Sequence, residues 1–212
     1  MNVETTRNLV EALGELKPLF LYISISTDYV FDGTKGAPYD ESDLPHPLSV
    51  YGMTKLEAER VALSAAPAIV VRLSTLFGPG RKSFCDHIVS RLSSEEPVEA
   101  FTDQTTSPTY TEDAAEGLEA LIHSVRRLGV PSLPSRIVHV ANAGGCSRFE
   151  FARHVARLLD RPSTGIRPIR MAEQARPAPR PAYSALDTRY LGRLIGKPLQ
   201  PWTDAVEAYL RP

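Results

Sequence analysis

Hydrophobic positions follow two different spacings along the chain, and their alternation predicts an α/β fold. Apolar residues recur with helical spacing over residues 2–16, 48–65, 83–94, 112–126 and 148–159, and shorter helices are expected at 187–195 and 203–210. Three runs are apolar at nearly every position, as in strands covered on both faces: residues 19–25, 68–73 and 137–140. Strands that alternate with helices predict a Rossmann-like, doubly wound parallel sheet.

Polar residues at the ends of these segments add detail. Thr111 is expected to cap the helix over 112–126, which has acidic residues in its first turn. Ser147 and Glu150 form a capping-box pattern at the start of the next helix. Residues 161–185 are rich in Pro and Arg, and we expect them to be irregular.

Composition narrows the class of protein. The chain has 212 residues, 42% of them hydrophobic and 23% charged, which suits a single globular domain with a real core. A formal net charge of −1 indicates neither a nucleic acid nor an anionic membrane as partner. No apolar run approaches the ~18 residues of a membrane span, and the N-terminus does not have the pattern of a signal peptide. We therefore expect a cytoplasmic protein without a membrane partner.

Cysteine and histidine positions predict no metal site. Cys85 and Cys146 are far apart and lack a zinc-ligand spacing, so neither a zinc site nor a disulfide scaffold is expected. The five histidines are scattered without a metal-binding spacing, and we expect structural roles for them.

Candidate chemistry is concentrated between residues 26 and 55. Tyr51 and Lys55 are four residues apart in a predicted helix, so their side chains share one face. An ammonium group near a phenol favours the phenolate, which makes such a phenol usable as a general acid or base. Thr27 ends the preceding strand and could donate a hydrogen bond to a substrate carbonyl oxygen. No side chain supplies hydride, so carbonyl reduction here would need a nicotinamide cofactor. Alternatively, Tyr51 and Lys55 are an exposed helical pair worth a few tenths of a kcal/mol.

Several motifs together resemble one enzyme family. The first runs from Ser26 to Gly33 as Ser-Thr-Asp-Tyr-Val-Phe-Asp-Gly, and the second is Tyr51-Gly52-x-x-Lys55-x-x-x-Glu59. Matching residues continue downstream at Val71-Arg72-x-Ser74, Asp103-Gln104-x-x-Ser107-Pro108-Thr109, Asp113-Ala114-Ala115 and Arg180-Pro181-x-x-Ser184-x-Leu186-Asp187. Over nearly the whole chain, this pattern resembles the extended short-chain dehydrogenases/reductases, and within them the dTDP-4-dehydrorhamnose reductases.

The resemblance implies a function and a set of site residues. It implies reduction of a keto group on a nucleotide-activated sugar, with NADPH or NADH as cofactor. Catalysis would fall to Thr27, Tyr51 and Lys55, with Tyr51 and Lys55 also holding the nicotinamide ribose. Substrate contacts would come from Thr27, Asp28, Thr75, Asp103 and Gln104. Asp103 and Gln104 also fit simple turn chemistry.

The same resemblance has two gaps. Where family members often have a Trp that packs on the substrate, this chain has Thr75. The Gly-rich turn that binds dinucleotide pyrophosphate is absent as well, because neither Gly33-x-x-Gly36 nor Gly78-x-Gly80 has the fingerprint or its strand–helix context. We therefore expect a chain truncated at its N-terminus, or one that needs a second copy or a complementing chain, and we expect the strand over 19–25 to form an exposed sheet edge.

The expected domain layout follows from this reading. Residues 1–74 and 111–141 would form the remnant of the Rossmann sheet, residues 75–110 and 142–186 a substrate-binding lobe, and residues 187–212 C-terminal helices.

Other interpretations of the chain stay open. A non-catalytic subunit similar to the regulatory subunit of methionine adenosyltransferase would share both central motifs, and a sugar-nucleotide epimerase would share the Tyr-x-x-x-Lys pair. Arg167, Arg170, Arg176 and Arg180 could hold a diphosphate, although a solvated, proline-stiffened loop explains them equally well.

Overall fold

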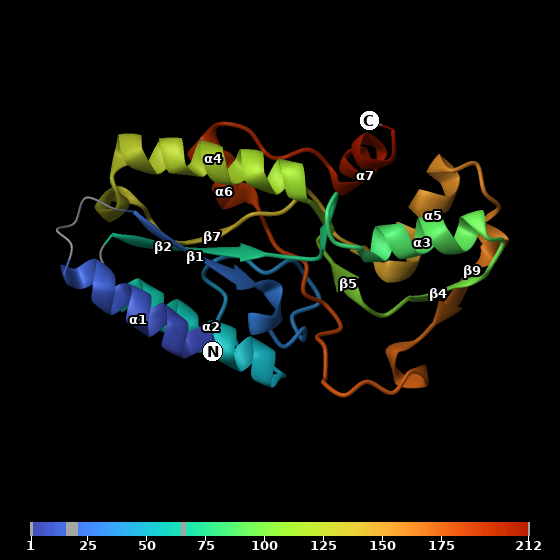
Figure 1. Cartoon of the computed structure of the whole chain (residues 1–212), viewed down its shortest axis with the longest axis horizontal. Helices are drawn as coiled ribbons and strands as arrows, with labels where there is room; N and C mark the ends of the chain where they lie inside the picture. Colours follow the sequence, from blue (N-terminus) through green and yellow to red (C-terminus); the bar gives the residue numbers. More distant parts are fainter. Residues whose placement is uncertain (1, 16–20, 65–66, 212) are drawn as a thin grey trace.

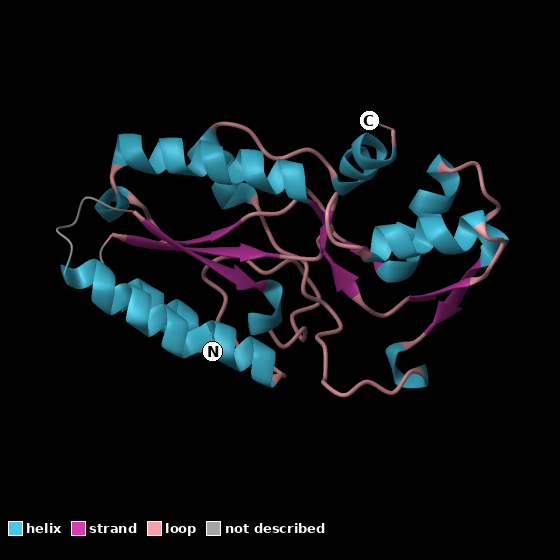
Figure 2. Ribbon diagram, viewed as in Figure 1, coloured by secondary structure: helices cyan, strands magenta, loops and turns pink. Residues whose placement is uncertain are grey.

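A three-stranded parallel sheet lies between two helical layers, and a smaller lobe adjoins it (Figures 1 and 2). The chain is represented by a computed structural model that describes residues 2–15, 21–64 and 67–211. The sheet has the order β1-β2-β7, formed by β1 (Tyr22–Thr27), β2 (Ala68–Leu73) and β7 (Ile137–His139). All pairs are parallel, which confirms the predicted α/β class.

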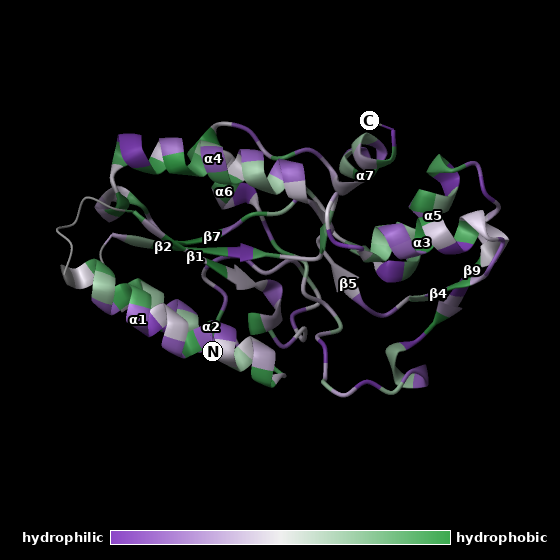
Figure 3. Cartoon of the chain, in the orientation of Figure 1, coloured by the Kyte–Doolittle hydropathy of each residue, from purple (hydrophilic) through white to green (hydrophobic). Residues whose placement is uncertain are grey.

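Helices cover both faces of this sheet, as the burial of β2 from Ala68 to Arg72 requires. Helices α1 (Asn2–Glu15) and α2 (Val50–Ser64) lie on one face, and α4 (Thr111–Leu128) and α6 (Arg189–Ile195) lie on the other (Figure 1). The outer helices show both hydrophobic and hydrophilic colours in Figure 3, as expected for amphipathic elements. Among the described residues, no helix is long and apolar enough to cross a membrane.

Strand β1 is an edge strand of the described sheet, as the sequence predicts. It pairs only with β2, from Tyr22 opposite Ala68 to Thr27 opposite Leu73. The strand therefore continues past the predicted end at Ile25, because Ser26 and Thr27 find polar partners in the interior. The predicted first residues, 19 and 20, lie outside the described part of the chain.

The lobe is built from short elements that join the sheet domain at its carboxyl end. Helices α3 (Phe84–Ser93) and α5 (Arg148–Leu158) pack on β4 (Val98–Phe101) and β9 (Ile166–Ile169), and α7 (Trp202–Leu210) closes the cluster. Two small pairs connect the parts: β3 (Leu76–Phe77) with β6 (Thr109–Tyr110), and β5 (Thr105–Thr106) with β8 (Cys146–Ser147).

Two local predictions were wrong. Residues 161–185 are not wholly irregular, because β9 pairs with β4 and buries Ile166 and Ile169. Pro168 hid this strand, although an edge strand tolerates proline. Thr111 is not a cap but the first residue of α4, and Tyr110 precedes it without a side-chain cap. The capping box of Ser147 and Glu150 is confirmed.

Two hydrophobic clusters divide the buried residues approximately as the expected domain layout does. The layout itself stays a prediction. One cluster joins β2, β7, α4 and α6, and the other joins α3, α5, β4, β9 and α7. The two C-terminal helices thus pack in different clusters, with Leu191 of α6 on the sheet side and Val206 of α7 in the lobe.

Candidate active site

Thr27 lies where β1 ends, and local geometry fixes its hydroxyl. The chain leaves the strand into a short 3-10 helix, η1 (Asp28–Val30), and Thr27 is its N-cap. The Thr27 Oγ1 accepts a hydrogen bond from the backbone N–H of Tyr29 and donates one to Asp28 Oδ1, at 3.2 and 3.1 Å. Thr27 is buried, so its hydroxyl is largely shielded from solvent.

Gly52 lets helix α2 pack directly on η1. A Cβ added at this glycine would lie 2.3 Å from the carbonyl oxygen of Tyr29 and 2.9 Å from Cβ of Pro47, so no side chain fits. This close contact sets the ring of Tyr51 edge-on against the ring of Tyr29, with centroids 6.2 Å apart. Tyr51 itself is half-exposed and available to a ligand. The close packing of α2 on η1 thus explains why a glycine follows Tyr51.

Lys55 lies one turn further along α2 and reaches back to the same strand. Its Nζ donates a hydrogen bond of 2.9 Å to the carbonyl oxygen of Ile25, two residues before Thr27. The structure therefore gathers Thr27, Tyr51 and Lys55 around the carboxyl end of β1. This is the edge at which ligands of open α/β sheets bind.

A buried ion pair ties α2 to the sheet behind this site. Glu59 accepts hydrogen bonds from Nε and Nη2 of Arg72 on β2, at 2.9 and 2.7 Å, and both side chains are 2% exposed. Ser26 donates a further hydrogen bond to Glu59. The Arg72 guanidinium also lies over the ring of Phe31, 5.0 Å from its centroid. Residues from β1, β2 and α2 are thereby linked next to Thr27.

Asp28 connects the sheet domain to the lobe instead of facing an open site. Its Oδ2 accepts hydrogen bonds from the hydroxyls of Ser74 and Ser184, at 2.9 and 2.6 Å, and Oδ1 accepts from Thr27. Burial raises the pKa of this carboxyl, although the three hydroxyls oppose the shift. Ser107 extends the network, because its backbone N–H donates to Ser74 Oγ. The sequence motifs contain these serines, but their convergence on one carboxylate is visible only in the fold.

The other predicted substrate residues are spread over the lobe. Thr75 directly follows the buried Ser74 and has a φ of 38°, a left-handed backbone that is strained for a β-branched residue. Asp103 accepts a hydrogen bond from the backbone N–H of Met171 and contacts no catalytic candidate. Gln104 is buried, and its Nε2 has no hydrogen-bond partner among the described residues.

The described residues fit one part of a nicotinamide cofactor. Tyr51 and Lys55 offer a phenol and an ammonium that could hold ribose hydroxyls. Gly33 and Gly78 are closed to a pyrophosphate, because a Cβ at Gly33 would meet the backbone of Ala182 at 2.8 Å and one at Gly78 would meet Thr111 Oγ1 at 2.0 Å. In the described ranges, no group of His, Cys, Asp and Glu side chains could hold a metal ion.

Comparisons with known proteins assign the chain to a family. The model of the RmlD substrate binding domain matches residues 1–212. The chain belongs to the RmlD substrate-binding domain family. It is 38% identical over 194 residues to the dTDP-4-dehydrorhamnose reductase of Mycobacterium tuberculosis, covering 89% of this chain and 62% of that protein. It is 36% identical over 208 residues to a probable dTDP-4,6-dihydroxy-2-methyloxan-3-one 4-ketoreductase of Streptomyces antibioticus, covering 97% and 68%.

Solved structures of this family share the fold. The dTDP-4-dehydrorhamnose reductase of Bacillus anthracis, solved in complex with NADP, superposes with a TM-score of 0.84 at 30% identity, covering 99% of this chain and 71% of that one. The chain thus spans roughly two thirds of the length of these relatives.

Proposed function

We propose that this chain carries the carbonyl-reducing site of an NAD(P)H-dependent reductase for a keto group on a nucleotide-activated sugar, of the dTDP-4-dehydrorhamnose reductase type in dTDP-rhamnose biosynthesis. One observation carries the proposal: packing of α2 on η1 through Gly52 gathers a threonine hydroxyl, a half-exposed phenol and an ammonium at the end of β1. Relatives named as reductases of dTDP-linked keto sugars support the substrate class.

Each side chain has a distinct role in this proposal. Thr27 would turn its O–H from Asp28 towards the substrate carbonyl oxygen and stabilise the negative charge that develops there. Tyr51 would donate its phenolic proton to that oxygen. Lys55 would stabilise the resulting phenolate and bind ribose hydroxyls, while its hydrogen bond to Ile25 keeps it in place. NADPH or NADH, when bound, supplies the hydride.

The further site residues remain part of the proposal. Asp28 would act on the sugar nucleotide indirectly: it holds the Thr27 hydroxyl until the substrate carbonyl replaces it as acceptor, and its other oxygen accepts from Ser74 and Ser184. Thr75, Asp103 and Gln104 would line the lobe side of the substrate, and the unpartnered Nε2 of Gln104 supports a ligand contact there. We also propose a cytoplasmic protein whose reductase activity involves a homodimer or a complementing chain.

The alternatives have less support. Relatives named as reductases do not favour a regulatory subunit. A UDP-glucuronic acid 4-epimerase of Bacillus cereus is similar in structure, with a TM-score of 0.77, but at 22% identity this likeness shows the fold alone.

Substitution of Tyr51 tests the proposal. Tyr51→Phe removes the proton donor and keeps the ring against Tyr29, so we expect kcat to fall by ~10²–10⁴-fold while dTDP affinity is unchanged. Tyr22→Phe, at the opposite end of β1, removes a phenolic oxygen far from the site and should leave kcat unchanged. Wild-type kcat in Tyr51→Phe would remove this residue from the acid role.

A further inference from the structure

The three hydroxyls that surround Asp28 are bound with unequal strength. Its Oδ2 accepts hydrogen bonds of 2.6 Å from Ser184 and 2.9 Å from Ser74, whereas its Oδ1 accepts one of 3.1 Å from Thr27. The first distance is typical of a strong, charge-assisted bond to a carboxylate, and the last is longer than an ordinary bond between a hydroxyl and an oxygen. The carboxylate therefore binds Ser184 most firmly and Thr27 most loosely.

Hydroxyl groups solvate the charge of Asp28 in place of bulk water. Asp28 is 2% exposed, and Ser184 and Ser74 are 0% and 1% exposed. Burial raises the pKa of Asp28, and the hydrogen bonds from Ser184, Ser74 and Thr27, in that order, oppose this shift together with the positive charge of Arg148 on α5. Because hydrogen bonds in a network polarise one another, two donors on Oδ2 draw the negative charge towards that oxygen and make Oδ1 a weaker acceptor.

The backbone on both sides of Ser184 fixes its position. Its N–H donates a hydrogen bond of 2.8 Å to the carbonyl oxygen of Thr105 on β5. The carbonyl oxygen of the next residue, Ala185, accepts one of 2.9 Å from the N–H of Tyr39. Ser184 is thus held between the lobe and the loop that follows η1, and its hydroxyl stays within reach of Asp28.

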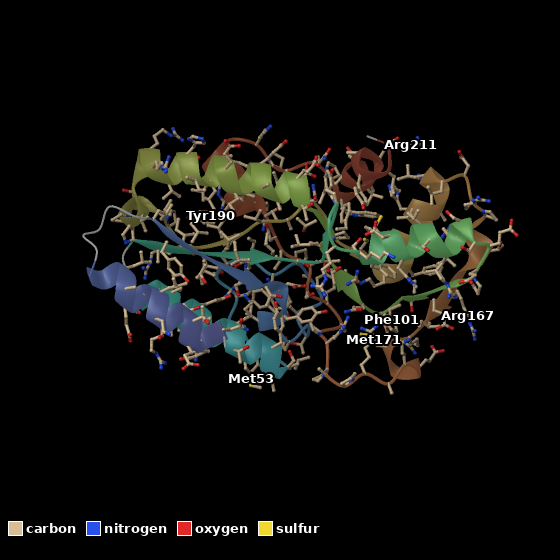
Figure 4. All side chains as sticks on the ribbon, in the orientation of Figure 1. Met53, Phe101, Arg167, Met171, Tyr190 and Arg211 are labelled. Atoms are coloured by element: carbon tan, nitrogen blue, oxygen red, sulfur yellow. The ribbon has the colours of Figure 1, made fainter. Side chains whose placement is uncertain are left out.

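Ser74 is aligned from the lobe as well. Its Oγ accepts a hydrogen bond of 3.3 Å from the backbone N–H of Ser107, which leaves its own proton for Asp28. The bonds to Asp28 join the two parts of the molecule. In Figure 4, Met53 of α2 lies in the sheet domain and Phe101 of β4 lies in the lobe. Closure of the lobe on the sheet therefore determines how Asp28 is solvated.

We propose that Ser184 and Ser74 are positioning residues: they take up the negative charge of Asp28 on Oδ2 and thereby leave the O–H of Thr27 free to turn to the substrate carbonyl oxygen. The inference deepens the proposed function and rests on it for the reaction. Thr27 has one hydroxyl proton, which it can give to Asp28 or to the substrate. A carboxylate with its charge concentrated on Oδ1 would retain that proton and compete with the developing oxyanion.

A carbon-13 NMR titration of the Asp28 carboxyl, combined with steady-state kinetics on NADPH and a dTDP-4-keto sugar, tests this role. Ser184→Ala removes the shortest bond, so Asp28 should titrate at a higher pH than in the wild type, and kcat should fall about tenfold with KM unchanged. Outright loss of an oxyanion donor costs ~10²–10³-fold, and the expected effect is smaller because Thr27 itself remains. Ser74→Ala should change both quantities in the same direction by less, since its bond is longer.

Ser107→Ala is the matched control. Ser107 is buried in the same region, and its Oγ accepts a hydrogen bond of 3.0 Å from the N–H of Leu186, two residues after Ser184. The variant removes a support of this segment and keeps both donors to Asp28, so the carboxyl should titrate as in the wild type.

Three results would overturn the proposal: an unchanged titration of Asp28 in Ser184→Ala, a wild-type kcat in that variant, or an equal change of the titration in Ser107→Ala. A wild-type protein that reduces no keto sugar would contradict the proposed function. The titration would then still decide whether Ser184 controls the charge of Asp28.

Discussion

Neutralising Glu59 should destabilise the fold more than any other conservative change on α2. Glu59→Gln keeps the size of the side chain but leaves the Arg72 guanidinium buried beside a neutral amide. The carboxylate also accepts a hydrogen bond from Ser26, so the change disturbs contacts among α2, β1 and β2. Breaking one side of a fully buried ion pair costs about 3–5 kcal/mol, because the remaining charge stays desolvated.

That loss is large against the stability of an ordinary domain. Whole domains are stable by about 5–15 kcal/mol, and a urea m-value of ~2 kcal/mol per molar converts a loss of about 3 kcal/mol into a midpoint ~1.5 M lower. Equilibrium unfolding in urea, followed by circular dichroism, measures this shift. The m-value should stay unchanged if the native state remains intact.

Glu57→Gln is the matched control on the same helix. Glu57 pairs with Arg60 at 3.1 Å on an exposed face, and such pairs contribute about 0–1 kcal/mol. We therefore expect its unfolding midpoint to stay close to that of the wild type. Equal midpoints for Glu59→Gln and Glu57→Gln would refute the view that the buried pair fixes α2 against the sheet.

Two further predictions concern the ends of β1 and α2. Gly52→Ala puts a Cβ 2.3 Å from the carbonyl oxygen of Tyr29. We therefore expect a loss of about 1–3 kcal/mol in the free energy of unfolding in urea, and a lower kcat because Tyr51 is displaced. Wild-type values of both quantities would contradict the close packing. The raised pKa of Asp28 means that the folded protein keeps a proton that the unfolded chain has lost, so this residue reduces stability as the pH rises from its ordinary pKa of 3.8 through the folded value. Asp28→Asn should remove this loss of stability, so the difference in unfolding free energy between variant and wild type should change with pH. A difference that stays constant from about pH 3 to pH 7 would contradict the raised pKa of Asp28.

Much of the fold is predictable because its signals are local. The apolar run of β2 and the helical spacing of α2 and α5 determine these elements within a few residues. Strand β9 escapes such reasoning, because only Ile166 and Ile169 face the interior and Pro168 lies between them. Its partner β4 is separated from it by more than sixty residues, and no local pattern encodes that pairing.

The candidate site likewise has residues that the sequence predicts and contacts that only the fold shows. Tyr51 and Lys55 are readable as a pair because helical geometry places them on one face. The partners of Asp28 are not readable, since Ser74 and Ser184 come from distant segments that only the tertiary structure brings together.

NADPH oxidation measured together with the fate of a dTDP-4-keto sugar tests the central claim most directly. A reductase consumes NADPH in step with the loss of the keto group, and we predict this stoichiometric conversion for the wild-type protein. Conversion of the sugar to an epimer without net NADPH consumption, or binding of sugar and NADPH without any turnover, would contradict the account.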